Sequence, residues 1–209
     1  MIIFDIETGP LPESDMPPFD ESTVKLGQLK DPIKVTAKIE EARAKYVERA
    51  ALSPLTGQVL AIGYLPPGEA ESIVVENENV LLADFWWRFL SHRRHGNIIV
   101  GHNILGFDLP FLVRRSWLLG IDVPADAFDG RYFNRIFVDT MDRWGCGTRG
   151  GDFVKLDVLA KAFGVGGKPD GITGGMFAEL LANDRKAAEE YLHNDLEMTA
   201  KVAERMGLV

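Results

Sequence analysis

The sequence predicts an α/β fold in which helices pack against a mixed β-sheet. Residues 2–6 are almost entirely apolar, which is typical of a central strand buried on both faces. Residues 58–64 and 72–75 have strand composition and flank a turn at 66–68 that contains proline and glycine, which indicates an antiparallel hairpin. Further along the chain, short apolar runs alternate with helical patterns, as they do in sheets covered by helices.

A long segment, residues 10–56, separates the first strand from the hairpin. Its first part, residues 10–32, is rich in proline and acidic residues, which favours an irregular chain. Residues 33–51 are dominated by Ala, Glu, Lys and Arg, with apolar residues three or four apart, which predicts a helix. We treat residues 10–56 as an insertion that forms either a small lobe or flap, or a simple surface elaboration.

The remaining elements complete an order of strand, insertion, two strands, helix, strand, helix, strand and helices. Residues 79–94 have an amphipathic pattern rich in aromatic residues, which predicts a helix packed on the sheet. The other expected helices span 109–119, 156–163 and 185–206, and the other expected strands span 97–100 and 136–139. Nothing in this order splits the chain, so we expect a single domain over residues 1–209.

The composition is that of a globular protein, with 46% hydrophobic and 26% charged residues. The single cysteine, Cys146, excludes an internal disulfide and favours a reducing compartment. Asp5 interrupts the first apolar run, so we expect no signal peptide. No apolar stretch approaches the ~20 residues that a membrane-spanning helix needs. We therefore expect a cytoplasmic protein with no membrane partner.

The net charge of −8 argues against a protein that coats nucleic acid through phosphate contacts alone. It does not exclude an enzyme whose bound cations meet the phosphate. The charge is also uneven, because residues 88–149 contain nine arginines, six aspartates and no lysine. This positive span is either a solvated surface or a phosphate-facing patch.

Two acidic residues stand close together on the first strand. Side chains alternate along a strand, so Asp5 and Glu7 point to the same side. Two carboxylates ~4 Å apart repel by about 4 kcal/mol at an effective dielectric near 20. Such a pair is tolerated when a divalent cation sits between the two groups, or when one carboxyl keeps its proton. The cation interpretation predicts that further acids arrive from elsewhere in the chain.

Two later segments supply such acids. Asp108 follows the strand at 97–100 and opens the next helix, a place where α/β sheets bind ligands, although a simple N-cap is the alternative. Tyr191 and Asp195 lie four residues apart, so they share one face of the last helix. Each has an ordinary alternative, namely core packing for the tyrosine and a solvated helix acid for the aspartate.

Together these segments resemble the DnaQ-like, or DEDD, superfamily of 3′–5′ exonucleases. Three motifs carry the resemblance: Phe4-Asp5-Ile6-Glu7-Thr8, then His102-Asn103 through Phe107-Asp108, and finally Tyr191 through Asp195. The third motif is similar to that of the tyrosine-bearing (DEDDy) subclass, which includes the proofreading domains of family B DNA polymerases and the RNase D-type enzymes. The histidine-bearing subclass has histidine five residues before the aspartate, where this chain has Glu190.

The resemblance implies an RNase H-like fold with a five-stranded mixed sheet. It also implies that four residues ligate two Mg²⁺ or Mn²⁺ ions, namely Asp5, Glu7, Asp108 and Asp195. Hard oxygen ligands suit such ions. In this subclass Tyr191 is expected to hold the attacking water, and a phenol with an ordinary pKa near 10 is better suited to orient water than to act as a base.

Several neighbouring residues are candidate substrate contacts, each with a structural alternative. Thr8 and Gly9 follow the acid pair and either seat the terminal nucleotide or form a turn. Asn103 either touches substrate or holds its loop, and Phe107 either stacks on a base or packs in the core. Two basic residues are further candidates for a phosphate contact, Lys155 and Arg149.

We therefore expect a metal-dependent exonuclease that releases nucleoside 5′-monophosphates from the 3′ end of a nucleic acid. Single-stranded DNA is the favoured substrate, and RNA remains open because an RNase D-type enzyme performs the same chemistry. A catalytically silent RNase H-like module that only binds nucleic acid or protein is the alternative of another class. A polymerase or another replication or repair protein is a possible partner in trans, with a role in proofreading or DNA repair.

Overall fold

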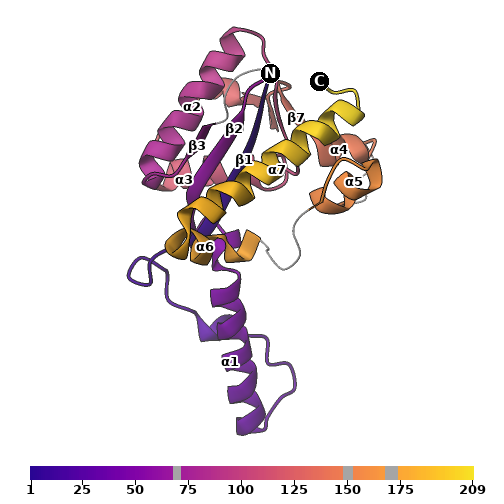
Figure 1. Cartoon of the computed structure of the whole chain (residues 1–209). Coiled ribbons are helices and arrows are strands. Elements are labelled where there is room, and N and C mark those ends of the chain that lie inside the picture. The colour runs from indigo at the N-terminus through magenta and orange to yellow at the C-terminus, as the bar shows by residue number, and fades with distance from the viewer. Residues whose placement is uncertain (68–71, 148–152, 168–173) are drawn as a thin grey trace.

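The computed structural model describes residues 1–67, 72–147, 153–167 and 174–209. Its centre is a five-stranded sheet with the order β3-β2-β1-β4-β7 (Figure 1). The strands are β1 (Ile2–Pro10), β2 (Gly57–Leu65), β3 (Ser72–Val74), β4 (Ile99–Gly101) and β7 (Phe137–Asp139). The turn that joins β2 to β3 lies partly outside the described residues.

The central strand, β1, has one antiparallel and one parallel neighbour. It pairs antiparallel with β2 and parallel with β4. The outer pairs continue this division, because β2 and β3 are antiparallel while β4 and β7 are parallel. The sheet is therefore mixed, in the RNase H-like pattern, and the predicted fold class is confirmed.

Helices cover both faces of the sheet (Figure 1). One layer contains α2 (Glu78–Arg94) and α3 (Asp108–Leu118), and the other contains α5 (Leu156–Phe163), α6 (Phe177–Asn183) and α7 (Arg185–Arg205). Alternate residues of β1 divide between the two layers. Ile2, Phe4 and Ile6 pack into the large core with α2 and α3, whereas Ile3 packs with α7. Asp5 and Glu7 follow Ile3 on the α7 face.

The core between the sheet and the first helical layer is rich in aromatic rings. Phe4 on β1 lies with its ring centroid 5.2 Å from that of Phe85, and Phe85 lies 4.8 Å from Trp86. The Trp86 indole N–H donates to the Ser116 hydroxyl at 2.8 Å, which joins α2 to α3. Aromatic side chains bury large apolar areas, so this layer contributes much of the free energy that stabilises β1 in the fold.

Most predicted elements agree with the structure to within about two residues at their ends. The first strand is longer than expected, because β1 continues four residues beyond the predicted end and reaches Pro10. The helix expected at 33–51 ends at Glu48, and a separate 3₁₀ turn follows at Ala50–Leu52. Three short elements lack a prediction: the hairpin of β5 (Phe128–Asp129) and β6 (Tyr132–Phe133), α4 (Thr140–Trp144), and α6. Elements of two to seven residues are too short to establish a hydrophobic period.

The insertion after β1, residues 11–56, forms a projection that we call the arm. Figure 1 shows its main helix, α1 (Pro32–Glu48), extending away from the sheet. Asp31 caps this helix by accepting from the Ile33 N–H, and Pro32 occupies the first turn, as is usual for a helix start. No residue of α1 is fully buried.

Over the described ranges of the chain, none of the helices is both long and apolar enough to cross a membrane.

Candidate metal centre

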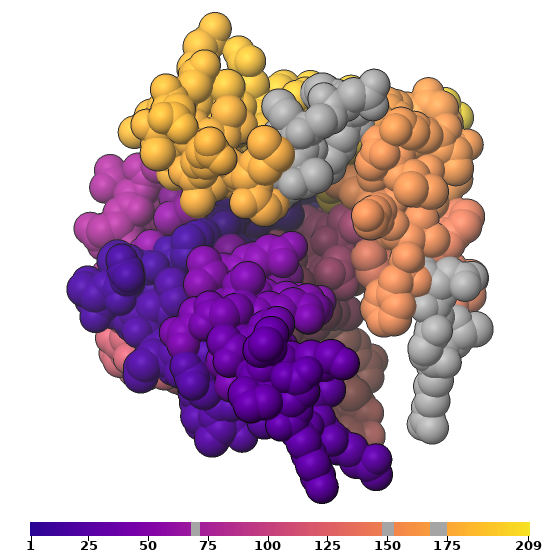
Figure 2. All heavy atoms as spheres, turned by 90° about the horizontal axis from the view of Figure 1, so that it is seen from below, coloured from indigo at the N-terminus to yellow at the C-terminus, as the bar shows by residue number. Residues whose placement is uncertain are grey.

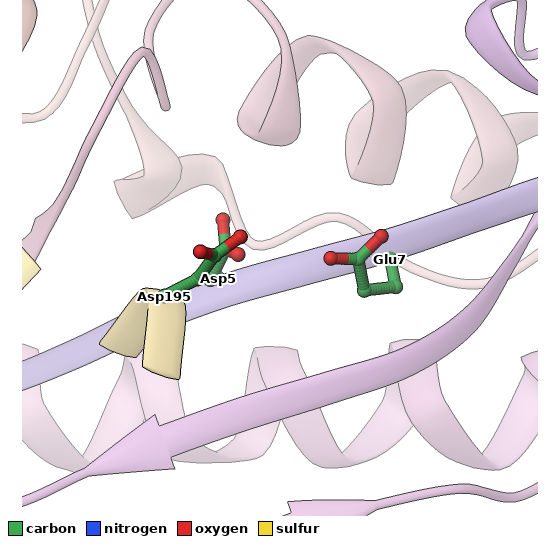
Figure 3. Close-up of side chains that lie close together, drawn as sticks. All are labelled: Asp5, Glu7 and Asp195. Atoms are coloured by element: carbon green, nitrogen blue, oxygen red, sulfur yellow. The ribbon is translucent and has the colours of Figure 1, made fainter. Parts of the chain in front are cut away.

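Three carboxylates from two elements meet on the α7 side of β1. Asp5 and Glu7 come from β1, and Asp195 comes from α7. One oxygen atom from each lies within 4.8 Å of the others. Figure 3 shows the Asp195 carboxylate beside that of Asp5, with Glu7 further along the strand. The structure thus brings together three of the four acids that the sequence nominates as metal ligands.

A glycine on β2 lets α7 approach the strand closely enough for this meeting. Gly63 is the β2 residue paired with Asp5. A Cβ atom at Gly63 would lie 2.7 Å from the Leu196 side chain and 3.0 Å from that of Leu192. These two leucines flank Asp195 on α7, so the missing side chain at position 63 sets the depth to which Asp195 reaches.

A β-bulge lies opposite the second acid. Glu7 pairs with Ala61, but Thr8 pairs with Val59, so Leu60 is an extra residue on β2. Bulges locally twist a strand and redirect its side chains, and they are common beside functional sites. Here the register shifts between Glu7 and Thr8, so the direction of the Glu7 side chain is independent of the strand end at Thr8 and Gly9.

A buried ion pair holds the bulge in place. The Glu78 carboxylate accepts from the Val59 N–H at 2.8 Å and pairs with the Arg115 guanidinium at 2.6 Å. Both side chains are less than a tenth exposed. Arg115 also donates to the carbonyl of Pro54 at 2.9 Å. The pair therefore ties α2, α3, the β2 bulge and the base of the arm together, and Arg115 does not belong to the solvent-facing part of the arginine-rich span.

The fourth acid, Asp108, is bonded to the acidic strand. It is the first residue of α3, the N-cap position belongs to Phe107, and the Asp108 carboxylate accepts from the backbone N–H of Ile6 at 3.2 Å. The pKa of Asp108 is raised to about 7, mainly by burial and to a smaller extent by the nearby charge of Asp139. The hydrogen bonds from the Ile6 N–H and from the Asp5 side chain oppose that rise. The Asp108 carboxylate thus contacts the backbone of β1 at the residue between Asp5 and Glu7.

Asp139 is a further residue of the site that the sequence interpretation missed. Its buried carboxylate accepts from the backbone N–H groups of Asn103 at 2.8 Å, Leu105 at 2.9 Å and Met141 at 2.9 Å. The first two belong to the loop that joins β4 to Asp108. Asp139 thereby fixes that loop to the end of β7. An aspartate at a strand end, directly before a short helix, is the one sequence signal that could have identified it.

The predicted second motif is shaped mainly by contacts within the protein. Asn103 has a positive φ of 62°, and its side-chain oxygen fills the space where a Cβ of Gly106 would lie, 2.4 Å away. The ring nitrogens of His102 lie 2.8 Å from the Thr140 hydroxyl and 2.8 Å from the Val154 carbonyl. Lys155 directly follows Val154 and is exposed, so it stands next to this loop.

The candidate contacts at the end of β1 and directly before α3 lie close to other parts of the protein. Thr8 is buried, and a Cβ at Gly9 would lie 2.4 Å from the Leu60 side chain and 3.2 Å from Ala178 of α6. Phe107 is half-buried, with its ring centroid 5.5 Å from that of Phe111. Arg149 lies outside the described residues.

Tyr191 is buried one helical turn before Asp195. Its ring centroid lies 6.2 Å from that of Phe177, and it belongs to the same apolar cluster as Ala61. Ala61 is the residue paired with Glu7 across the β1–β2 ladder. Tyr191 and Asp195 therefore flank the acid pair from the same helix, the tyrosine near Glu7 and the aspartate near Asp5.

The donor set at this site fits hard divalent cations. All three clustered ligand groups are carboxylates, and carboxylate oxygens are preferred by Mg²⁺ and Mn²⁺. Figure 2 shows the surface from the end where the arm leaves the sheet, and it is hollowed between the arm and α5. Asp5 is half-buried, and Glu7 and Asp195 are buried.

Comparison with known proteins identifies the fold. No family profile matches the sequence, and no curated protein matches it. Among solved structures, the chain is similar to the family B DNA polymerase from the hyperthermophilic archaeon Pyrobaculum calidifontis, with a TM-score of 0.62 and 20% identity. The match covers 98% of this chain but only 24% of the polymerase chain. The chain thus has the fold of about a quarter of that polymerase, an RNase H-like α/β sheet flanked by helices.

Proposed function

We propose that this protein is a metal-dependent 3′–5′ exonuclease that hydrolyses the terminal phosphodiester bond of a nucleic-acid strand and releases nucleoside 5′-monophosphates. The observation that carries the proposal is the convergence of Asp5, Glu7 and Asp195 within 4.8 Å of one another on an RNase H-like sheet. Asp108, bonded to the backbone between the first two, completes the set of four acids. The corresponding quarter of the similar polymerase would be its exonuclease domain.

Each side chain has a defined part in this proposal. Asp5, Glu7, Asp108 and Asp195 would hold two Mg²⁺ or Mn²⁺ ions. Such ions, when bound, supply positive charge to the attacking and leaving oxygens and lower the pKa of a water. Tyr191 would orient that water by a hydrogen bond, since an ordinary phenol stays protonated at neutral pH. Asp139 would keep the Asp108 loop in the position that metal binding needs.

The direct test is digestion of a 5′-labelled single strand in the presence of Mg²⁺ or Mn²⁺. We expect a ladder that shortens from the 3′ end, together with nucleoside 5′-monophosphates as the only small product. The same strand with a chelator, and the Asp5→Ala variant with metal, are the controls and should leave it intact. A wild-type protein that binds the strand but never shortens it would instead favour a catalytically silent binding module.

The substrate is the finer part of the proposal. The similarity to a DNA polymerase favours single-stranded DNA over RNA. Matched DNA and RNA strands digested side by side test this preference, and faster loss of the RNA would favour an RNase D-type activity, because sugar discrimination depends on contacts to the 2′-hydroxyl. We further propose that a polymerase or another replication or repair protein is its partner, and that both act in the cytoplasm.

A further inference from the structure

The long helix of the arm has two unlike faces. One face carries half-buried residues at helical spacing, namely Val35, Ile39, Ala42 and Tyr46. They lie toward the preceding part of the arm, where the Tyr46 ring centroid is 5.5 Å from that of Phe19 and the Tyr46 hydroxyl donates to the Pro17 carbonyl at 2.6 Å. Arg43 lies over the Phe19 ring and pairs with Glu21. This side of α1 is therefore occupied by the arm itself.

Positive charge gathers on another side of the helix, which we call the basic face: Lys34, Lys38, Lys45 and Arg49. All four residues are exposed, and their spacing of four, seven and four places them within about 60° of one another around the helix axis. Glu41 pairs with Lys45 at 2.6 Å on this side, and Glu48 lies at its border. The basic face keeps an excess of positive charge, although acidic residues outnumber basic ones in the arm as a whole.

The base of the arm is fixed to the strand that carries the acids. The Leu11 N–H donates to the Thr56 carbonyl at 2.8 Å, and the Gln58 side chain donates to the Pro10 carbonyl at 3.0 Å. Ala50 is fully buried beside β1, and Arg115 reaches Pro54 as described above. The C-terminal end of α1 is therefore the end next to the sheet. Lys45 and Arg49 therefore lie toward the sheet, and Lys34 and Lys38 lie toward the tip of the arm.

We propose that the basic face of α1 binds the sugar–phosphate backbone of the strand whose 3′ end occupies the metal centre. This inference rests on the proposed exonuclease function. The argument is charge complementarity: a chain with a net charge of −8 repels a polyanion, so a positive surface on an arm that is fixed to the strand of the acids offsets that repulsion locally. A helix of 17 residues is about 25 Å long, so its basic residues can contact several successive phosphates of one strand.

Two pairs of substitutions test the inference by position. Lys45→Gln with Arg49→Gln removes the two charges near the sheet, and Lys34→Gln with Lys38→Gln removes the two near the tip. Glutamine has nearly the helix propensity of lysine and arginine, so α1 should persist. The matched control is Arg93→Gln with Arg94→Gln, which removes two exposed charges at the C-terminal end of α2, at the opposite end of the sheet (Figure 1).

The effect of the arm variants on cleavage should depend on the length of the substrate strand. With strands of about 20 nucleotides, each arm variant should raise KM by roughly tenfold and reduce the salt dependence of log(kcat/KM) by about 1.4, at about 0.7 for each lost phosphate contact. With strands of about four nucleotides only the variant near the sheet should have an effect. The kcat value, and hydrolysis of the p-nitrophenyl ester of thymidine 5′-monophosphate, should be unchanged in both arm variants and in the control.

Binding measurements keep this inference separate from the proposed activity. Fluorescence anisotropy of a labelled strand reports affinity whether or not the strand is cleaved. If the wild type does not cleave but the arm variants still bind the strand more weakly, the exonuclease proposal fails while the basic face stands. If both arm variants bind and cleave long strands as the control does, the inference is overturned, and a protein partner becomes the better occupant of this face.

Discussion

The two faces of β1 carry opposite kinds of side chain. Toward α2 and α3 the strand presents Ile2, Phe4 and Ile6, all buried in the aromatic core. Toward α7 it presents Ile3 and then, one pleat further each time, Asp5 and Glu7. The comparison teaches that one face of the strand stabilises the fold and the other gathers charge that the fold must tolerate. Substitutions on the two faces should therefore separate stability from activity.

The largest expected effect is on the acidic face. Asp5→Asn should reduce nuclease activity by about 10³-fold or more, since loss of even one electrostatic stabiliser costs about 10²–10³-fold. In a chelating buffer the same variant should unfold at an equal or higher denaturant concentration than the wild type, because one member of a repelling pair is gone. Activity assays and urea unfolding measure the two quantities, and a marked loss of stability would contradict the division between the faces.

The apolar face should give the opposite result. Phe4 is fully buried, so Phe4→Ala should lower the free energy of unfolding by about 3–5 kcal/mol. The metal-binding affinity of the molecules that remain folded should change little, because the carboxylates are on the other side of the strand. Urea unfolding and isothermal titration with Mn²⁺ provide the measurements. A variant that is stable but has lost metal binding would show that the faces are not independent.

Tyr191 sharpens the comparison within the acidic face. Tyr191→Phe keeps the ring that packs near Phe177 but removes the hydroxyl. We expect kcat to fall by about 10²-fold, the lower end of what a positioned proton donor or acceptor contributes. Affinity for Mn²⁺ should be retained, because the carboxylates are intact. Unchanged turnover would remove Tyr191 from the mechanism.

The smallest expected effect concerns pH. The pKa of Asp108 is raised to about 7 in the folded protein against 3.8 as its ordinary value, so the folded state binds the proton more tightly than the unfolded state. The contribution of Asp108 to the free energy of unfolding is fully present below about pH 4 and is lost as the pH rises through 7. In a chelating buffer we expect the free energy of unfolding to fall by about 1 kcal/mol between about pH 6 and pH 8.

Asp108→Asn is the control for this pH dependence, because it cannot lose a proton. Its unfolding free energy should vary less than that of the wild type over the same range. Added Mg²⁺ should also flatten the wild-type profile, since a bound cation favours the ionised carboxyl. An equally steep decline in the Asn variant would assign the pH dependence to other groups.

The sequence predicts the fold well where elements are long or strongly apolar. The five strands of the main sheet and the helices α1, α2, α3, α5 and α7 follow from composition and periodicity. The elements without a prediction, namely α4, α6 and the β5–β6 hairpin, have at most seven residues and thus no measurable period. Their positions depend on tertiary contacts that only the folded chain makes.

The candidate site was predictable to a different extent. Its acids stand in recognisable motifs, but the residues that support them do not. Asp139 acts through backbone N–H groups more than 30 positions away, and Arg115 pairs with Glu78 at a separation of 37. Neither relation leaves a local pattern, and Arg115 sits in a run that favoured an exposed surface. The role of Gly63 could not be predicted from the sequence either, because it depends on leucines from a distant helix.

The hydrogen bonds at the base of the arm have a consequence for redesign. Because Leu11 bonds to Thr56 and Arg115 needs the carbonyl of Pro54, the chain is already pinned on the body side of the projection. The part of the arm beyond that point can be exchanged for a short connector or a foreign binding module at little cost in stability, although the basic face would be lost, provided residues 50–56 stay. This fold therefore offers a graft point next to its chemistry, where new specificity can be attached without rebuilding the sheet.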